Sequence, residues 1–298
     1  MPRIAYVNGA YVPHRHAHVH IEDRGYQFAD GAYEVVNTYR GRLVDEVLHL
    51  ERLERSLDEL SIAAPMSPKA MRLIMREVVR RNRMTTGLLY IQVTRGVAPR
   101  DHRFPQSVKP AVVMTARAIP EFPQEMREEG VKVLTIPDIR WARCDIKSVA
   151  LLPNILGKQA AAEAGAYEAW MVDGEQLITE GVSSNAWIVT ADNVLVTRPT
   201  GHRILAGITR RAIIDLATEL GYAVEERPFT VAEAMAAKEA FMSNSSHFVT
   251  PVTQIDDAVI ANGKPGGLTL ELHHRYVRYM EETLPLDSPV SKSTDFST

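Results

Sequence analysis

Lys147 is a candidate for covalent chemistry because of the residues that follow it. The stretch from 148 to 157 reads "SVALLPNILG" and carries no charge before Lys158. Most lysines are solvated, since burying an ammonium group is costly unless the group is paired or neutralised. Two interpretations therefore stay open: an ordinary surface lysine beside an apolar strand, or an amine held in a cavity for covalent chemistry.

Three other segments carry groups that could work with such an amine. Glu180 lies in "TEGVSSN", before a glycine and small polar residues and just ahead of an expected strand. Arg52 lies on an expected helix. The segment "AGITRR" places Gly207, Ile208 and Thr209 at an expected helix start, where free N–H groups and the helix dipole favour a phosphate. The common nucleotide-binding signatures, Gly-x-Gly-x-x-Gly after a strand and a loop ending in Gly-Lys-Ser/Thr, are missing.

Together these groups match the needs of one cofactor, pyridoxal 5′-phosphate. It requires an amine for its aldehyde, a cradle for its phosphate and a partner for its ring nitrogen. Lys147 could be the amine, the helix start with Arg52 the cradle, and Glu180 the partner of the ring nitrogen. Each residue alone has a plainer interpretation, because Glu180 could be a solvated turn residue and Arg52 could pair with Glu51 and Glu54 on an exposed face.

Composition limits the class of protein. With 298 residues, 45% of them hydrophobic and 24% charged, the chain predicts two domains or one large soluble one. A net charge of −3 without a basic block gives no support for a nucleic-acid partner, and no apolar run is long enough to cross a membrane. The single cysteine, Cys144, favours a reducing cytoplasm and is more typical of a packed residue than of a reactive thiol.

The chain divides at a proline-containing stretch. We expect an N-terminal α/β domain over residues 1–118, a linker over 119–125 ("IPEFPQE"), and a C-terminal cofactor domain over 126–287. The polar residues 288–298 are expected to be a disordered tail.

Hydrophobic spacing and turn residues predict the main elements. Asn8-Gly9 predicts a hairpin, and Ser67 is placed to cap a helix over 67–82. A second helix, over 46–60, should bury its apolar stripe, which consists of Val47, Leu50, Leu53, Leu57 and Leu60. Further helices are expected over 207–222 and 267–283. Strands are expected over 87–96, 109–119, 131–137, 168–173, 185–190 and 193–197.

The segment "HRHAHVH" resembles a metal site at first sight. If it is a strand, His14, His16, His18 and His20 all face one side and could bind zinc or nickel. Four ligands from one strand give poor tetrahedral geometry, so a solvated strand is the favoured interpretation.

Eight segments in their order along the chain resemble one enzyme family. They are "EDRGYQFADGAYE", "HLERLERS", "YIQVTRG", "PRDHRFP", "IRWARCDIKS", "TEGVSSN", "RILAGITR" and "SSHFVTPV". Together they closely resemble the D-amino-acid aminotransferases, which belong to the fold-type IV pyridoxal-phosphate enzymes with branched-chain aminotransferases and aminodeoxychorismate lyase. The resemblance implies an α+β fold of two domains, with the cofactor between a smaller N-terminal α/β domain and a larger C-terminal domain that has a barrel-like sheet.

The resemblance also implies roles for single residues. Lys147 corresponds to the Schiff-base lysine that also transfers the proton, Glu180 to the carboxylate at the ring nitrogen, and Arg52 to the phosphate-binding arginine. The other implied cofactor contacts are Leu205, Gly207, Ile208, Thr209, Ser245 and, near the ring hydroxyl, Arg140.

The "PRDH" segment points to the D-specific subgroup. In that subgroup a Pro-Arg-x-His segment and a tyrosine trap the substrate α-carboxylate, and here these residues are Arg100, His102 and Tyr33. An arginine fork, an imidazole and a phenol are suitable donors for a carboxylate. The Arg and His are expected to come from the partner subunit, so the resemblance implies an obligate homodimer; the alternative is a plain polar loop.

The expected activity is a ping-pong transfer of the amino group from D-amino acids, of the D-alanine or D-glutamate type, to 2-oxo acids. Alternatives of the same fold are a branched-chain L-amino-acid or (R)-amine transaminase and, less favoured, aminodeoxychorismate lyase. A catalytically idle cofactor-binding protein and a purely structural protein are rivals from other classes. Departures from the family pattern at Ala29, Val182, Asn244 and Ser245 leave substrate range and cofactor affinity open.

Overall fold

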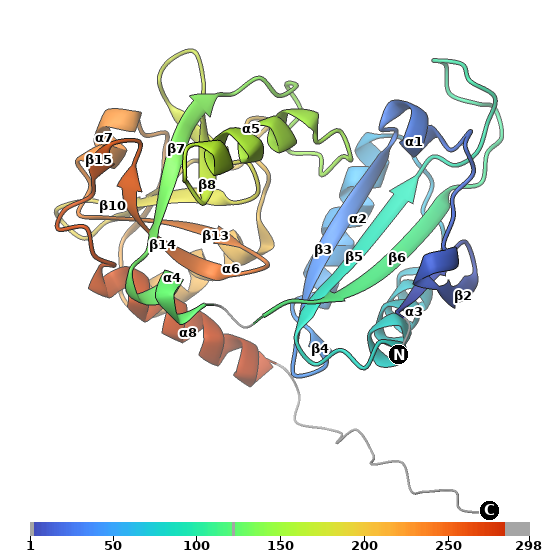
Figure 1. The fold of residues 1–298 in the computed structure, drawn as a ribbon, viewed down its shortest axis with the longest axis horizontal. Helices are drawn as coiled ribbons and strands as arrows, with labels where there is room; N and C mark the ends of the chain where they lie inside the picture. Colours follow the sequence, from blue (N-terminus) through green and yellow to red (C-terminus); the bar gives the residue numbers. More distant parts are fainter. Residues whose placement is uncertain (1–2, 121–122, 284–298) are drawn as a thin grey trace, which may run out of the picture.

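The computed structural model describes residues 3–120 and 123–283, which form two lobes, each built around one sheet (Figure 1). The first sheet takes its strands from residues 4–118 and the second from residues 131–259. The expected domain boundaries at 118 and 126 stay predictions, and the expected tail at 288–298 lies outside the described residues.

The first sheet has six strands in the order β2-β1-β6-β5-β3-β4, and each neighbouring pair is antiparallel. Its strands are β1 (Ile4–Val7), β2 (Ala10–Pro13), β3 (Gly31–Tyr39), β4 (Arg42–Leu43), β5 (Gly87–Thr94) and β6 (Ala111–Ala118). The predicted hairpin is confirmed: Asn8 and Gly9 both have positive φ, which this dipeptide tolerates in a tight turn between strands.

Helices α2 (Glu46–Glu59) and α3 (Pro68–Arg81) cover one face of this sheet, as Figure 1 shows. Both were predicted, and the Ser67 side chain accepts the N–H of Ala70, as its capping position requires. The predicted inner face of α2 is wrong at Val47, which is 49% exposed. The buried face instead includes the polar residues Glu46, His49 and Arg52.

The second sheet has nine strands in the order β12-β11-β10-β13-β14-β7-β8-β9, with β15 paired to β14. They are β7 (Val131–Pro137), β8 (Glu168–Val172), β9 (Ile178–Gly181), β10 (Asn185–Val189), β11 (Leu195–Thr197), β12 (Val224–Glu226), β13 (Glu239–Asn244), β14 (Phe248–Ile255) and β15 (Ala258–Val259). This sheet curls, and both of its faces are buried. Along β10, Trp187 packs among residues of the helical layer, whereas Ala186 and Ile188 pack inside the curl with Phe229.

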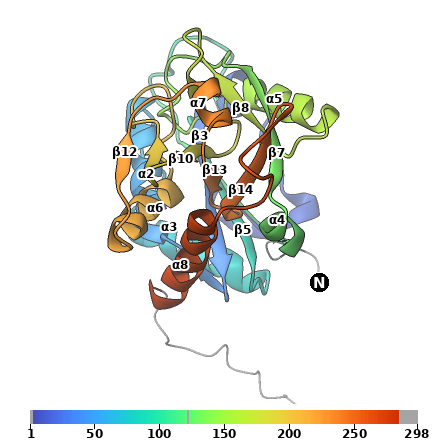
Figure 2. The same ribbon diagram turned by 90° about the vertical axis from the view of Figure 1, so that its left-hand side faces the viewer.

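The helices of the second lobe are α4 (Gln124–Glu128), α5 (Leu152–Glu163), α6 (Ile208–Glu219), α7 (Val231–Met235) and α8 (Gly267–Thr283). The views in Figures 1 and 2 place α6 and α8 along the second sheet, whereas α5 packs on β7 and β8. Helices α6 and α8 were predicted, and Gly221, with φ of +83°, ends the α6 segment as expected. Helix α5 was not predicted, and α4 begins inside the stretch that was expected to be a linker.

The strand expected through the histidine-rich segment is wrong. His14, Arg15 and His16 form a short 3-10 turn, η1 (His14–His16), and irregular backbone follows it. Strand β2 ends at Pro13, and the N–H of His14 makes one more bond to the first segment, at the Arg3 carbonyl 2.7 Å away, before the chain turns. The four imidazoles therefore do not share one face of a strand.

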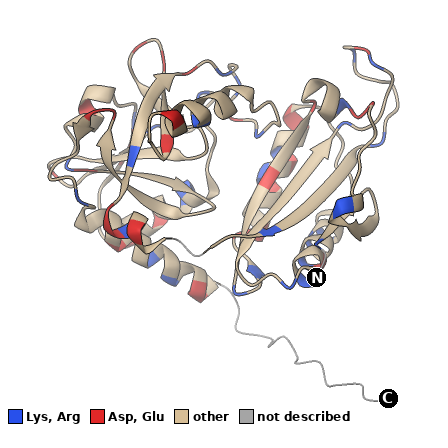
Figure 3. Cartoon of the chain, in the orientation of Figure 1, with Lys and Arg blue, Asp and Glu red and all other residues tan. Residues whose placement is uncertain are grey.

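Charges are mixed over both lobes in the view of Figure 3. Lysine and arginine lie beside aspartate and glutamate, in keeping with the small net charge of −3. Within residues 3–120 and 123–283, no helix has the length and apolar character that crossing a bilayer would require.

Candidate active site

A cavity of about 340 Å³ is lined by residues of both lobes. Strand β3 and helix α2 contribute from the first lobe, and loops and strands beyond residue 140 contribute from the second. Every site residue predicted from the sequence lines this cavity except Arg100 and His102. The predicted residues found in the lining are Tyr33, Arg52, Arg140, Lys147, Glu180, Leu205, Gly207, Ile208, Thr209 and Ser245.

Lys147 lies in the loop between β7 and α5, and its backbone is tied to the first lobe. Its N–H donates to Ser56 Oγ at 3.3 Å, and its carbonyl accepts the N–H of Tyr33 at 3.0 Å. The half-buried side chain places Nζ 4.2 Å from the centroid of the Tyr33 ring. The structure therefore places the amine at the cavity, as the second interpretation of the sequence expected, and its covalent role stays a prediction.

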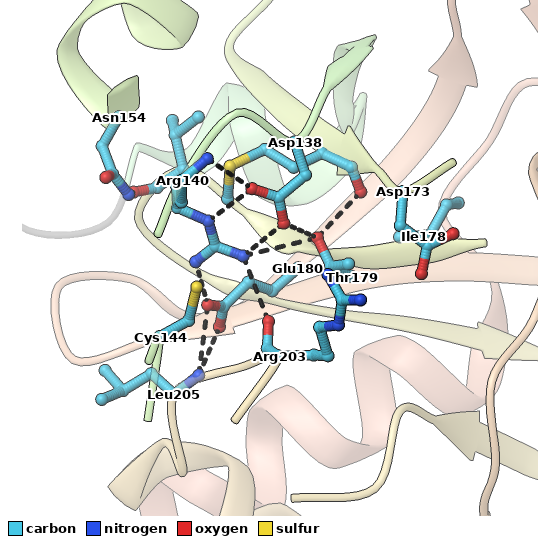
Figure 4. A network of polar contacts seen from close by, with 12 residues as sticks. Asp138, Arg140, Cys144, Asn154, Asp173, Ile178, Thr179, Glu180, Arg203 and Leu205 are labelled. Atoms are coloured by element: carbon cyan, nitrogen blue, oxygen red, sulfur yellow. Dashed lines mark hydrogen bonds and ion pairs between the residues drawn. The ribbon is translucent and has the colours of Figure 1, made fainter. Parts of the chain in front are cut away.

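Glu180 is buried in β9, so it is not the solvated turn residue of the plainer interpretation. Its carboxylate accepts hydrogen bonds from Arg140 Nη1 at 2.5 Å and from the Leu205 N–H at 3.1 Å (Figure 4). It also accepts a hydrogen bond from Asn185 Nδ2 at 3.0 Å. Burial raises the pKa of Glu180 above its ordinary value, and the neighbouring Arg140 charge opposes that rise. A raised pKa means that the Glu180 carboxyl binds a proton more tightly than an ordinary carboxyl does.

Arg140 is fixed between two carboxylates (Figure 4). Its Nε and Nη2 donate to Asp138 at 2.9 and 2.8 Å, while its Nη1 reaches Glu180. Burial alone would raise the pKa of Asp138, but hydrogen bonds from Arg140 and Thr179 hold it below its ordinary value. The structure thus assigns the charge of Arg140 to the support of Glu180, and its expected contact with a ring hydroxyl stays a prediction.

The Arg52 guanidinium is held by the buried carboxylate of Glu34. Its Nε and Nη2 donate to the two oxygens of Glu34, both at 2.8 Å, and His49 Nδ1 lies 2.7 Å from the same carboxylate. Its Nη1 donates to the carbonyl of Ala206 at 2.9 Å, which joins α2 to the loop before α6. A guanidinium has five N–H donors, so these contacts leave two of them for a ligand. The exposed ion-pair row considered for Arg52 is therefore wrong.

The start of α6 forms the other side of the predicted phosphate cradle. Gly207 caps the helix, and the N–H groups of Ile208 and Thr209 have no intrahelical acceptor because they belong to the first turn. A Cβ at Gly207 would collide with Oδ1 of Asn185, the residue that also supports Glu180. Ser245 lies in the loop between β13 and β14, where its carbonyl accepts Asn37 Nδ2 at 3.0 Å.

Cys144 also lines the cavity, and its environment suits an inert thiol. Burial raises its pKa to about 11, and its Sγ donates to the carbonyl of Trp141. Since the thiolate is the reactive form, this thiol is a poor nucleophile near neutral pH.

Sequence reasoning missed the supporting carboxylates Glu34 and Asp138 and the supporting histidine His49. Two signals were available. Glu34 alternates with Tyr33 in a strand, so it must point to the opposite face, where α2 packs. His49 and Arg52 are one helical turn apart on the buried face of α2, among apolar residues. Both therefore need a polar partner inside the fold, and Glu34 is that partner.

Arg100 and His102 lie outside the cavity of their own chain. Both are exposed in the loop between β5 and β6, where they contact Phe28 rather than Tyr33. One chain therefore brings together the predicted cofactor residues and Tyr33, but not the rest of the predicted carboxylate trap.

Residues 31–255 match the amino-transferase class IV family, and this match covers most of the chain. The chain therefore belongs to the class IV aminotransferases, and the resemblance read from the sequence is confirmed. It is 42% identical over 274 residues to the D-alanine aminotransferase of Listeria innocua, covering 91% of this chain and 94% of the relative. It is 40% identical over 277 residues to the D-alanine aminotransferase of Staphylococcus aureus, covering 93% and 97%.

Solved structures confirm the fold class. The branched-chain amino acid aminotransferase of Escherichia coli superposes with a TM-score of 0.87 at 24% identity, over 94% of this chain and 95% of the other. The branched-chain aminotransferase of Thermoproteus uzoniensis with norvaline gives a TM-score of 0.84 at 24% identity, over 94% of this chain and 95% of the other. The α+β, fold-type IV architecture with its curled second sheet is therefore as expected.

Proposed function

We propose that this chain is a pyridoxal 5′-phosphate-dependent transaminase that moves the amino group of D-amino acids, of the D-alanine or D-glutamate type, to 2-oxo acids. The observation that carries the proposal is the convergence of the Lys147 amine, the Glu180 carboxyl and the start of α6 on one cavity. Relatives named D-alanine aminotransferases, which align over 91% and 93% of the chain, support D-amino acids as substrates. A cytoplasmic location, suggested by the lone cysteine, is part of the same proposal.

The cavity suits this cofactor in size and in chemistry. A volume of about 340 Å³ is in the range of small-molecule sites. The two remaining donors of Arg52 and the first N–H groups of α6 can hold a phosphate, and the Glu180 carboxyl can share a proton with a ring nitrogen. When bound, the cofactor supplies an aldehyde that accepts the amino group and a ring that takes up electron density from the substrate Cα.

Lys147 moves the proton in the proposed reaction. With the cofactor bound, its Nζ would take the proton from the substrate Cα and deliver it to the carbon that carried the aldehyde, so that water can release the 2-oxo acid and the amino group stays behind. Because its backbone is anchored to Ser56 and Tyr33, the amine approaches from one wall of the cavity. Holding the substrate carboxylate at a fixed place then decides which enantiomer presents its hydrogen to that amine.

The carboxylate needs a partner that the cavity lining does not supply. Of the cations in that lining, Arg52 and Arg140 are held by carboxylates and Lys147 is needed for proton transfer. The proposed donors are Arg100 and His102 of a second copy, which complete the site together with Tyr33. The active unit in this proposal is a homodimer.

An exposed apolar surface beside the cavity supports a homodimer. Trp141, Leu152, Ile155 and Leu156 are 46–66% exposed, and three of them lie on the first turns of α5. The uncharged run after Lys147 is therefore not an apolar strand: residues 148–151 precede α5, and residues 152–157 form its first turns. Apolar residues grouped in this way are typical of a protein contact, and a second copy has the loop that the site lacks.

A substrate panel tests the activity. With 2-oxoglutarate as acceptor, D-alanine should give pyruvate and D-glutamate, whereas L-leucine and (R)-1-phenylethylamine should react at least about 100-fold more slowly. Preference for L-leucine or for the amine would favour a branched-chain or (R)-amine transaminase. Release of pyruvate from aminodeoxychorismate, with no amino transfer from D-alanine, would favour the lyase, and bound cofactor colour without turnover would indicate an idle binding protein.

Mixing two inactive variants tests the shared site. Lys147→Ala removes the amine, and Arg100→Ala removes the carboxylate donor, so each homodimer should have two defective sites. In a mixed dimer, one site has both residues, and random exchange of subunits should restore about a quarter of the wild-type sites. D-alanine turnover after unfolding and refolding the two together measures this. If mixing restores nothing while both variants form dimers, Arg100 does not act across the interface.

A further inference from the structure

The loop that carries Arg100 and His102 is exposed, yet it is anchored from beneath. The side chains from Arg100 to Phe104 face solvent, and Phe104 is 61% exposed. Loops of this kind are normally the mobile and weakly packed parts of a fold. A loop that must deliver two side chains to a second subunit needs a rigid support.

Asp30 provides the base of that support by binding two buried arginines. Arg24 Nε donates to Asp30 at 2.7 Å, and Arg95 donates to both Asp30 oxygens at 2.8 and 3.0 Å. The Arg24 and Arg95 side chains are only 4% and 6% exposed. Arg95 also donates to the carbonyls of Leu60 and Ser61 at the end of α2, so the cluster is fixed to a helix. Two rigid guanidinium groups thus lie beneath the loop.

Arg24 connects this cluster to the loop backbone. Its Nη1 donates to the carbonyl of Asp101 at 2.6 Å. Asp101 lies directly between Arg100 and His102, so this one hydrogen bond restrains the peptide units that carry both side chains. The bond comes from a charged donor and is short, which makes it a strong restraint.

Phe28 restrains the two side chains themselves. The guanidinium carbon of Arg100 lies 4.6 Å from the centroid of the Phe28 ring, and that of Arg24 lies 4.9 Å from it. The His102 ring is 5.5 Å from the same ring, tilted by 50°. Phe28 ends helix α1 (Arg24–Phe28), and Ala29 after it has φ of +56°, which turns the chain sharply toward Asp30. One aromatic ring therefore contacts both predicted carboxylate donors and the arginine that holds their backbone.

We propose that Arg24 and Phe28 are positioning residues for the substrate carboxylate: they hold Arg100 and His102 in the arrangement that the second subunit's site requires. This inference rests on the proposed function. Neither residue lines the cavity, so each acts through the loop and not by touching substrate. Without the bond to Asp101 the two donors can shift, and a displacement of about 1 Å can reduce catalysis by up to about 100-fold.

Arg24→Met is the main test, because it removes the bond to Asp101 while Asp30 keeps Arg95 as its partner and Phe104 keeps its contact with Arg95. The KM for D-alanine should rise about 10- to 100-fold, and kcat should change much less. Cofactor affinity and the mass of the dimer should be unchanged. Phe28→Leu should raise KM in the same direction, and it replaces the first variant if Arg24→Met does not fold.

Arg103→Gln is the matched control. Arg103 belongs to the same loop and pairs with the Asp101 side chain, but it is 88% exposed, so KM should stay within about threefold of wild type. In a chain that already has Arg100→Ala and His102→Ala, adding Arg24→Met should have no further effect on KM. An undiminished effect in that background would overturn the inference, because Arg24 would then act by another route.

Hydrogen exchange gives a readout that does not depend on turnover. In the wild-type holoenzyme dimer, the amides of 100–104 should exchange slowly for an exposed loop; in Arg24→Met they should exchange faster, with β5 unchanged. An unchanged KM in Arg24→Met, while Arg100→Ala raises KM, would overturn the positioning role and leave the proposed function intact. An unchanged KM in Arg100→Ala itself would instead reject the carboxylate trap and with it this inference.

Discussion

Lys147→Met should reduce the kcat for D-alanine transamination by at least about 1,000-fold, since one side chain provides both the covalent amine and the proton carrier. The substitution keeps a side chain of similar length in the cavity. Arg52, Glu180 and the start of α6 remain in place, so the variant should still bind pyridoxal 5′-phosphate, with an altered visible absorption. Single-turnover measurements with D-alanine would separate the loss of chemistry from any loss of binding.

Lys158→Met is the control for that experiment. Lys158 is the next lysine along the chain, is 47% exposed and lies outside the cavity lining, so its removal should leave kcat close to wild type. Borohydride reduction and peptide mapping of the wild-type enzyme should mark residue 147. A mark on a different lysine, or substantial turnover by Lys147→Met, would contradict the assignment.

Glu34→Gln should lower the free energy of unfolding by about 3–5 kcal/mol at neutral pH, because it removes one partner of a fully buried ion pair. The carboxylate has no exposed surface and accepts three hydrogen bonds, from Arg52 and His49. Arg52 would keep its charge without its counter-charge. Cofactor affinity should fall as well, since the guanidinium loses the contact that orients its two free donors. Glu51→Gln, on the exposed face of the same helix, should cost less than about 0.5 kcal/mol.

The difference in unfolding free energy between wild type and Glu34→Gln should also depend on pH. Burial alone would raise the pKa of Glu34, but the charge and hydrogen bonds of Arg52 and the contact with His49 hold it well below its ordinary value. A depressed pKa in the folded state stabilises the protein fully above the ordinary carboxyl pKa of about 4.3, and this stabilisation is lost as the pH falls further. The stability gap between wild type and Glu34→Gln should therefore be constant near neutrality and shrink in acid. A gap that does not change with pH would contradict this account.

The elements that could be predicted are those with a clear period or a clear stop. Helices α2, α3, α6 and α8 have apolar residues at helical spacing, and Asn8-Gly9 and Gly221 mark a turn and a helix end. Strands β13 and β14 were missed although the equally buried β8 and β10 were predicted; in β14, Pro251 argues against a strand when only the sequence is considered. Helix α5 was missed because its exposed side is apolar, which is the opposite of the pattern that identifies a surface helix.

The candidate site was predictable in its cofactor-facing residues and not in their supports. Lys147, Glu180 and Arg52 stand in short segments whose order along the chain resembles a known family. Their supports come from elsewhere in the chain: Arg140 lies 40 residues before Glu180, and Glu34 lies 18 residues before Arg52. Such pairs follow from which strand packs against which helix, and no local pattern in the sequence specifies that.

Arg100 and His102 stand apart from the residues that surround Lys147, and this separation has a consequence for how such an enzyme can diversify. In the proposed function, one set of segments carries the chemical step, and a surface loop with its own support binds the α-carboxylate. Mutations in that loop can change whether a substrate must have a carboxylate without altering the residues around Lys147. A lineage could therefore change that requirement while the residues proposed for the chemistry stay the same.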